Sequence, residues 1–236
     1  MISVCLASYN GERFIAEQLN SILEQLSDQD ELIISDDGSN DGTISIINRF
    51  NDKRIRLFCH SEKKGIQKNF ENALKQVRGD IIFLADQDDI WEKGKVRTME
   101  MYLIDYDLVV SDCSIVDLNG KTTFDSFYAL RRSGHGLLKN IWQNSYLGCC
   151  MAFQRKILDK AIPLPAKVPM HDWWVGLVAE LFGTTCFCPE KLVRYRRHEE
   201  NKTPFVGQSQ FGFMDRVRFR KNLVYSLFRV WAGWQP

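Results

Sequence analysis

The chain has 236 residues, enough for one large domain or for two small domains that share a face. Its formal net charge of +1 argues against a dominant basic surface for phosphate, so nucleic acid is not an expected partner. Its first residues lack the basic and apolar pattern of a signal peptide, and no run of about 18 uncharged apolar residues would span a membrane. We therefore expect a cytoplasmic protein.

The first hundred residues alternate between strand and helix patterns. Short apolar runs typical of buried strands lie at residues 2–7, 32–34, 55–58 and 80–85. Apolar side chains recur at helical spacing in residues 12–26, 44–50 and 66–77. Asp41 is placed to cap the second of these helices. Alternation of this kind predicts an α/β fold with a mostly parallel sheet and helices on both faces.

From about residue 105 onward the pattern is less regular. Three further runs are typical of strands, at residues 108–110, 149–153 and 192–196. Asp172 opens an amphipathic helix that runs to Phe182, and residues 121–145 are rich in loops. No linker rich in Pro, Gly or Ser divides the chain, so we expect this half to elaborate the same sheet.

The seven cysteines include no C-x-x-C pair with the spacing of a zinc site. Their number and spacing favour free, buried thiols in a reducing compartment. A zinc site formed by Cys186, Cys188 and His198 is the alternative, but no second cysteine pair supports it.

Polar clusters follow three of the predicted strands. Residues 8–11 follow the first strand, residues 36–39 the second and residues 86–89 the fourth. In open α/β sheets, ligands bind outside the carboxyl ends of the strands. We therefore expect these three segments, which are distant in the sequence, to meet at one crevice.

The last of these clusters places Asp86, Asp88 and Asp89 within four residues. Like charges this close repel one another unless a cation neutralises them. Mg²⁺ and Mn²⁺ prefer carboxylate oxygens and complete their shells with phosphate and water, so we predict one of these ions here. The simpler interpretation makes Asp89 the cap of the following helix.

Tyr9, Asp36 and Asp37 are candidates for binding a nucleotide base. The ring of Tyr9 can stack on a base, and either carboxylate can accept a hydrogen bond from a base N–H. The alternatives are ordinary packing of Tyr9 against the next helix, and turn or cap roles for the two aspartates.

Asp172 and its neighbours form a further candidate site at a predicted helix start. In a functional interpretation Asp172 is a general base that deprotonates an acceptor hydroxyl, while Trp173 and Trp174 wall a sugar. An aspartate at a helix start is more often only a cap. His198 is either a solvated loop histidine or a ligand of a metal or phosphate.

Three segments resemble, in order and spacing, the successive signatures of glycosyltransferase family 2. They are residues 2–11, 36–43 and 84–91. The match extends over roughly residues 1–115 and implies an inverting enzyme of the GT-A fold with a Rossmann-like nucleotide-binding half. Three later segments resemble the branch that contains bacterial rhamnosyltransferases, at residues 146–149, 171–174 and 195–198.

The resemblance implies a role for each residue that would bind the donor. Tyr9 would stack on the pyrimidine, with Ser8 and Asn10 lining the same loop. Asp37 would hold the base, and Asp36 would support the base or the ribose.

The same resemblance extends to the diphosphate side of the donor. Lys68 and Asn69 match a family position near the nucleotide. Asp86 and Asp88 would form the D-x-D element, with Asp88 as the direct metal ligand and Asp86 facing the ribose and the metal. His198 resembles a late histidine that reaches back to the metal or the diphosphate.

On the acceptor side, Asp172 matches the acidic base of the family. Gly148, Trp173 and Trp174 are the residues expected to contact the acceptor. Many family members carry Glu-Asp at the base motif, whereas this chain carries His171 and Asp172.

The implied reaction moves a sugar from a UDP- or dTDP-sugar to a hydroxyl of a saccharide or lipid-linked acceptor, and rhamnose is one candidate for the sugar. The reaction would belong to the synthesis of a bacterial surface polysaccharide. Residues 1–115 would form the donor half, residues 116–205 the acceptor half of the same domain, and residues 206–236 a C-terminal helical segment. One alternative is an inactive module that binds sugar nucleotides or glycans, which should have lost carboxylates that are present here. Another is a nucleotidyltransferase, which would need a glycine-rich basic loop after the first strand.

The C-terminal segment mixes apolar and basic side chains, including Arg216, Arg218, Arg220, Lys221 and Arg229. This pattern is typical of a helix that lies on anionic lipid, so we predict peripheral contact with the inner face of the membrane. The alternative is a helix that packs on the domain or on a second subunit.

Overall fold

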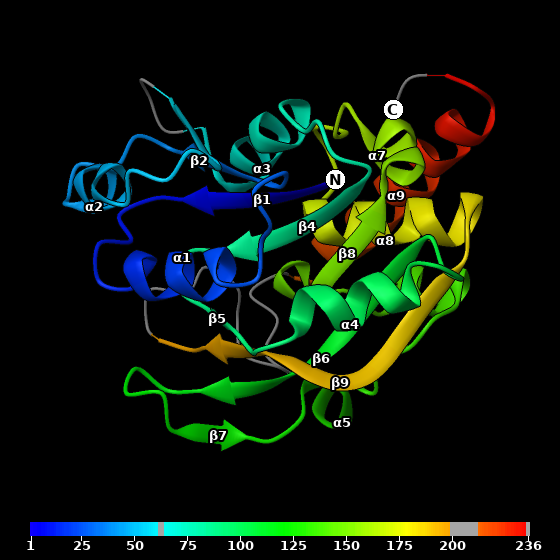
Figure 1. Ribbon diagram of the computed structural model, residues 1–236. Helices are drawn as coiled ribbons and strands as arrows, with labels where there is room; N and C mark the ends of the chain where they lie inside the picture. The colour runs from blue at the N-terminus through cyan, green and yellow to red at the C-terminus, as the bar shows by residue number, and fades with distance from the viewer. Residues whose placement is uncertain (61–63, 199–211, 235–236) are drawn as a thin grey trace.

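The computed structural model describes residues 1–60, 64–198 and 212–234 (Figure 1). The first part of the chain alternates strands and helices: β1 (Ile2–Ser8), α1 (Ile15–Leu23), β2 (Glu31–Asp36), α2 (Thr43–Arg49), β3 (Ile55–Cys59), α3 (Ile66–Lys75) and β4 (Ile81–Asp86). Every residue of β1 and β2 is buried, as expected for strands that are covered on both faces. The four strands and three helices predicted in this region are confirmed.

The remainder of the described chain holds shorter and more irregular elements. They are β5 (Ile90–Trp91), α4 (Lys95–Tyr102), β6 (Leu108–Val116), β7 (Thr122–Phe124), α5 (Phe127–Arg131), α6 (Leu137–Trp142), a 3₁₀ turn (Gly148–Cys150), β8 (Met151–Gln154), α7 (Arg155–Ala161), α8 (His171–Phe182), β9 (Thr185–Arg196) and α9 (Phe213–Trp231).

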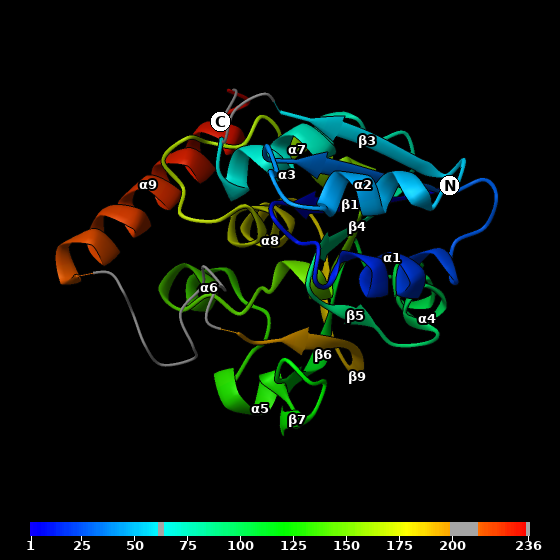
Figure 2. The same ribbon diagram turned by 90° about the vertical axis from the view of Figure 1, so that its left-hand side faces the viewer.

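In the described residues, nine strands form one sheet in the order β3-β2-β1-β4-β8-β6-β9-β5, and β7 pairs with β6. Strands β1 to β4, β6 and β9 run in one direction, while β5, β7 and β8 run against them. Helices α3 and α8 cover one face of the sheet, and α1 and α4 cover the other (Figure 2). The predicted α/β class with a mostly parallel sheet is therefore confirmed.

Strands from residues 1–115 and from residues 116–205 belong to this one sheet, and no separate second core interrupts it in the part of the chain described. The functional division at these boundaries stays a prediction. The first residues of the predicted C-terminal segment, 206–211, lie outside the described residues, and α9 occupies most of the rest.

The second half corrects two of the predicted strands. Residues 149 and 150 belong to the 3₁₀ turn, so the strand predicted at 149–153 begins at Met151. The run is apolar because it is buried, and burial by itself does not set the backbone conformation. Strand β9 begins at Thr185, ahead of the predicted residue 192. The sequence pattern did not show this earlier part of the strand, because Pro189 and charged residues interrupt its apolar run.

Helices α4 and α7 were not among the predicted elements. Each has fewer than nine residues, so each shows only about two turns of apolar periodicity.

The register of the sheet brings the polar clusters together. Ser8 at the end of β1 is level with Asp36 at the end of β2, and Ala7 is level with Asp86 at the end of β4. Strand β8 runs antiparallel between β4 and β6, so the turn that precedes β8 lies at the same edge of the sheet. Gly148 therefore approaches the acidic cluster from the second half of the chain.

Candidate functional site

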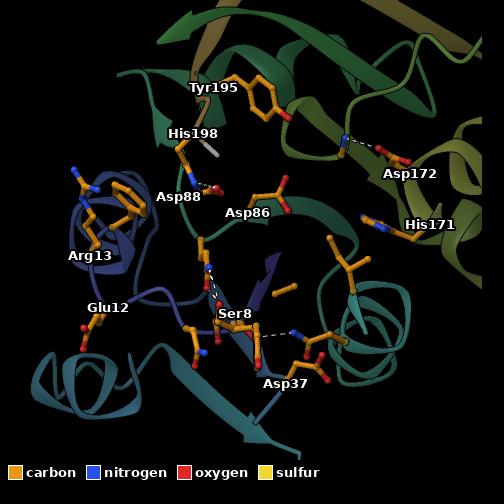
Figure 3. A pocket seen from close by; sticks show the side chains of 18 of the residues that line it. Ser8, Glu12, Arg13, Asp37, Asp86, Asp88, His171, Asp172, Tyr195 and His198 are labelled. Atoms are coloured by element: carbon orange, nitrogen blue, oxygen red, sulfur yellow. Dashed lines mark hydrogen bonds and ion pairs between the residues drawn. The ribbon is translucent and has the colours of Figure 1, made fainter. Parts of the chain in front are cut away.

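A cavity of about 630 Å³ opens at the carboxyl ends of β1 and β4 (Figure 3). Asp88 and His198 lie on one side of it, His171 and Asp172 lie on the other, and Asp86 lies between them. Ten of the residues predicted from the sequence line this one cavity: Ser8, Tyr9, Asn10, Asp37, Asn69, Asp86, Asp88, Gly148, Asp172 and His198. The expectation that distant segments meet at one crevice is confirmed.

The loop after β1 is held by the side chain of Gln87. Its Oε1 accepts a hydrogen bond from the backbone N–H of Tyr9 at 2.8 Å, and its Nε2 donates to the Tyr9 carbonyl at 3.0 Å. A Cβ atom at Gly11 would lie 2.3 Å from Gln87 Oε1, so the pairing needs a glycine at that position. The loop that carries Tyr9 is thus fixed to the acidic loop.

Asn10 adopts a left-handed backbone conformation with φ of 48°. Its Oδ1 accepts a hydrogen bond from the backbone N–H of Asn40, and its own N–H donates to Ser39 Oγ. Asparagine tolerates this conformation better than most residues because its side chain bonds locally. The contacts join the loop after β1 to the loop after β2.

Asp36 and Asp37 have different surroundings. Asp36 accepts hydrogen bonds from Ser8 Oγ, from Ser39 Oγ and from the Ser39 N–H, so it organises the two loops and does not line the cavity. Asp37 lines the cavity, and its two carboxylate oxygens accept from the N–H groups of Lys64 and Gly65. The structure places Asp37, and not Asp36, where a ligand would meet it.

Asn69 and Lys68 are neighbours on α3 that point to different places. Asn69 is buried, its Nδ2 donates to the Ser8 carbonyl at 3.0 Å, and its Oδ1 has no hydrogen-bond partner. Lys68 does not line the cavity, and its ammonium group pairs with Glu71 at 2.6 Å. The nucleotide contact expected of Lys68 stays a prediction, and its half-exposed side chain pairs here with Glu71.

The acidic loop after β4 combines three carboxylates in different states of burial. Burial, with the nearby charge of Asp88 as the next cause, raises the pKa of Asp86 to about 8. Asp88 Oδ2 lies 2.9 Å from Nε2 of His198, which the end of β9 brings back to the loop. Asp89 is fully buried, and burial raises its pKa well above the usual value.

Arg196 at the end of β9 anchors this loop. Its Nε donates to the Asp88 carbonyl at 2.9 Å, and its backbone N–H donates to Asp89 Oδ1 at 3.0 Å. The guanidinium also pairs with Glu17 and lies 4.9 Å from the ring centre of Phe14. The Arg196 guanidinium also donates to the carbonyl of Leu118, which follows β6. The sequence shows no sign of this anchor, because its partners come from three segments that are distant from one another in the chain.

The donor set fits a divalent cation. In the part of the chain that the structure describes, ligand atoms of Asp86, Asp89 and Cys149 lie within 4.8 Å of one another. Asp89 and Cys149 are buried behind the loop, whereas Asp86 and Asp88 line the cavity, and Asp89 Oδ2 has no hydrogen-bond partner. Asp88 is not a member of that cluster. Of the carboxylates in this loop, Asp86 and Asp88 line the cavity, and carboxylate oxygens are the ligands that Mg²⁺ and Mn²⁺ prefer.

The alternative zinc site of Cys186, Cys188 and His198 is not supported. These three residues do not form a ligand cluster among the described residues, and His198 is directed to Asp88. All seven cysteines are free, and five of them are buried, as expected for unpaired thiols.

Asp172 enters the cavity from the first turn of α8. Its Oδ2 accepts a hydrogen bond from the Gly148 N–H at 3.1 Å, and its Oδ1 accepts from the N–H of Trp173. Burial raises its pKa to about 6, while these backbone hydrogen bonds act in the opposite direction. A carboxylate with this pKa is ionised at neutral pH and remains basic enough to accept a proton.

His171 lines the cavity beside Asp172 and was not among the predicted site residues. Its ring stacks on Phe70 with centroids 3.8 Å apart, and neither ring nitrogen has a hydrogen-bond partner. Burial lowers its pKa to about 3, so the imidazole is neutral. Its departure from the usual Glu-Asp pattern was the available signal.

The two tryptophans after Asp172 do not line the cavity. Trp174 is fully buried, and its Nε1 donates to the Ala161 carbonyl at 2.8 Å. The Nε1 of Trp173 donates to the Asn140 carbonyl at 2.6 Å. Consecutive helical residues point about 100° apart, and this rotation places the Trp174 ring in the core. The sugar contact expected of Trp173 stays a prediction.

Other cavity residues were outside the sequence predictions. They include Glu12, Arg13, Phe14, Gln87, Leu147 and Tyr195. Phe14 stacks with His198 at a centroid distance of 5.1 Å and thereby supports one side of the cavity. Arginine and aromatic residues scattered along a sequence carry no local signal of this convergence.

Comparison with known proteins places this chain in a family. The model of glycosyl transferase family 2 matches residues 3–162. The glucosyltransferase WfgD of Escherichia coli, named for a GlcNAc-diphosphoundecaprenol acceptor, is 28% identical over 75% of this chain and 68% of its own length. The dTDP-rhamnosyl transferase RfbG of Shigella flexneri is 28% identical over 84% of this chain and 73% of its own length. The chain spans about two thirds of the length of curated relatives such as WfgD.

Solved structures share the fold. TarS 1-349 of S. aureus in complex with UDP-GlcNAc has a TM-score of 0.72 and 19% identity over 98% of this chain and 70% of that chain. The mannosyltransferase PcManGT of Pyrobaculum calidifontis, in complex with GDP-Man and Mn²⁺, has a TM-score of 0.66 and 22% identity over 85% of this chain and 58% of that chain. The fold is of the GT-A type, and the chain belongs to glycosyl transferase family 2.

Proposed function

We propose that this protein transfers a sugar from a pyrimidine nucleotide-sugar, UDP- or dTDP-linked, to an acceptor hydroxyl with inversion at the anomeric carbon. The observation that carries the proposal is the single cavity into which Tyr9, Asp37, Asp86, Asp88 and Asp172 open from distant parts of the chain. The donor half would be residues 1–115, and the acceptor half residues 116–205.

On the donor side, Tyr9 stacks on the base and Asp37 accepts a hydrogen bond from a base N–H. Ser8, Asn10 and Asn69 line the same end of the cavity, and the unpaired Oδ1 of Asn69 is available to a donor group of the nucleotide. The loops that carry these residues are fixed before the ligand binds, which lowers the entropic cost of binding.

Asp86 and Asp88 would hold Mg²⁺ or Mn²⁺, with His198 orienting Asp88 through the 2.9 Å contact. The complex of PcManGT with Mn²⁺ supports a divalent ion in this fold. When bound, the cation supplies charge neutralisation at the departing diphosphate. Asp86 would face the ribose as well as the metal.

On the acceptor side, Asp172 takes the proton of the attacking hydroxyl. The Gly148 N–H holds one of its oxygens, so the carboxylate is oriented before the acceptor enters. Proton transfer by a positioned base typically accelerates a reaction by about 10²–10⁴-fold. A single displacement with the base opposite the leaving group inverts the anomeric centre.

The acceptor that we propose is a saccharide, free or carried on a lipid diphosphate, in the synthesis of a bacterial surface polysaccharide, with rhamnose as one candidate for the transferred sugar. The names of WfgD and RfbG support these choices. The described residues include no helix long and apolar enough to cross a membrane. We propose peripheral contact with the inner face of the membrane because a lipid-linked acceptor would lie there.

The test is calorimetric titration of UDP and dTDP, with ADP as a purine control, in Mg²⁺, in Mn²⁺ and in EDTA. We expect metal-dependent binding of one pyrimidine nucleotide, and roughly 5- to 150-fold weaker binding in Tyr9→Ala, which corresponds to about 1–3 kcal/mol of base stacking. Tyr225→Ala, in an exposed position on α9, is the matched control and should bind as the wild type does. Absence of pyrimidine binding under every metal condition would refute the proposal.

A further inference from the structure

Helix α9 has two apolar faces, and the domain covers only one of them. Leu223, Leu227 and Val230 are buried against the domain, where α9 contacts α6 and α8. A second apolar stripe lies beside this buried face. Spacing of three, four or seven residues aligns in it Met214, Val217, Val224, Phe228 and Trp231, which are 76%, 47%, 50%, 54% and 64% exposed. An apolar stripe on this scale is uncommon on an isolated surface.

The exposed face of α9 continues onto α6. Leu138 and Trp142 of α6 are 82% and 73% exposed. Arg220 of α9 donates a hydrogen bond to the Trp142 carbonyl, and its guanidinium lies 5.1 Å from the centre of the Trp142 ring. We call these seven apolar residues of α9 and α6 the outer apolar surface.

Basic side chains accompany this surface. Within Phe213–Trp231 there are five arginines and lysines and one acidic residue, Asp215. Lys221 stands within the stripe itself, and Arg218 and Arg229 flank it on the helix. Four of the exposed side chains in this region are Trp142, Tyr225, Trp231 and Trp234, and rings of this kind concentrate where apolar and aqueous phases meet.

The charge of the surface selects among possible occupants. A second copy of the chain would bring two sets of like charges together, which is unfavourable. Anionic headgroups complement the lysine and arginines, and acyl chains accommodate the apolar stripe.

The outer apolar surface also lies on the acceptor side of the molecule. Helix α9 contacts α8, whose first turn carries Asp172, and lies apart from α1 and α2 (Figure 2). A lipid-linked acceptor held in a bilayer under α9 would approach the cavity from the side of its base.

From these observations we propose that the outer apolar surface of α9 and α6 docks the protein on an anionic lipid bilayer, with α9 lying in the interface. The inference deepens the proposed function, on which its acceptor geometry rests. The docking itself requires neither donor binding nor turnover.

The experiment is flotation of the full chain with vesicles of phosphatidylcholine alone and with vesicles that contain phosphatidylglycerol. We expect binding to the anionic vesicles, and a reduction of about tenfold or more in Val224→Asp/Phe228→Asp, because both residues leave apolar contact and add negative charge. Met101→Asp/Ile104→Asp is the matched control: these residues are 62% and 80% exposed near the end of α4, and the change in net charge is the same. This control should float as the wild type does.

A second variant, Lys221→Glu/Arg229→Glu, tests the electrostatic part without changing the apolar stripe, and should bind anionic vesicles less while leaving nucleotide binding in vesicle-free buffer unchanged. Equal flotation of the wild type and Val224→Asp/Phe228→Asp would overturn the proposal. So would a wild-type dimer in solution that this variant abolishes, with no vesicle binding by either protein. Absence of pyrimidine nucleotide binding by the wild type would instead count against the proposed function, because the calorimetric titration contains no lipid.

Discussion

The side chain of Gln87 pairs with both backbone polar groups of Tyr9, at 2.8 Å and 3.0 Å. This contact spans 78 residues of sequence and joins the loop that would receive the base to the loop that would receive the metal. The two halves of the proposed donor site are thereby held in one fixed relation, with Gly11 leaving the space that the amide occupies.

Gly11→Ala should weaken donor binding by displacing the Gln87 amide. The new methyl would overlap Gln87 Oε1, so the two hydrogen bonds to Tyr9 would break at a cost of about 1–3 kcal/mol. Calorimetric titration of the preferred pyrimidine nucleotide measures the loss. In a Gln87→Ala background the same substitution should cause little further loss, and fully additive effects of the two changes would contradict this coupling.

Metal binding should strengthen as pH rises. The pKa of Asp86 is raised to about 8, so without a cation this carboxyl is mainly protonated at pH 7 and a bound ion must displace the proton. Titration of Mn²⁺ between pH 6 and pH 8 should show affinity increasing by up to about tenfold per pH unit. Asp86→Asn should flatten this dependence, and a wild-type affinity that is equal at both ends of the range would contradict the assignment.

Turnover should fall as pH falls through the pKa of Asp172, which is about 6. The basic form is the carboxylate, which is present above this pKa and lost below it, so kcat should drop about tenfold per pH unit under acidic conditions. Asp172→Asn should lower kcat by about 10²–10⁴-fold with little change in nucleotide affinity. An unchanged kcat in this variant would remove Asp172 from the role of base.

Trp174→Ala should destabilise the fold and should lower activity only by reducing the amount of folded protein. The ring is fully buried, so its removal should cost about 3–5 kcal/mol of the free energy of unfolding. Urea denaturation measures this loss. Normal stability together with a specific rise in acceptor KM would restore the role in sugar binding that the sequence predicted.

Much of the donor side was predictable because its information is local. An apolar run of six or seven residues makes a buried strand, and the polar residues directly after it must lie at the carboxyl edge of the sheet. Tyr9, Asp37 and Asp86 therefore had predictable positions once β1, β2 and β4 were identified. The sequence also showed that His171 stands where many family members carry Glu, but it did not show that the His171 ring stacks on Phe70.

The amino-acid sequence by itself determined the strands and helices from β1 to β4 and the edge of the sheet at which polar residues gather, because apolar periodicity and chain direction set these features within a few residues. Tertiary structure decided which of the polar side chains face the cavity. Asp36 accepts hydrogen bonds within the two loops, and Lys68 forms an ion pair with Glu71. Trp174 is buried in the core, and His198 contacts Asp88. These outcomes depend on helix rotation and on the antiparallel pairing of β5 with β9, which brings Asp88 and His198 together across 110 positions of sequence.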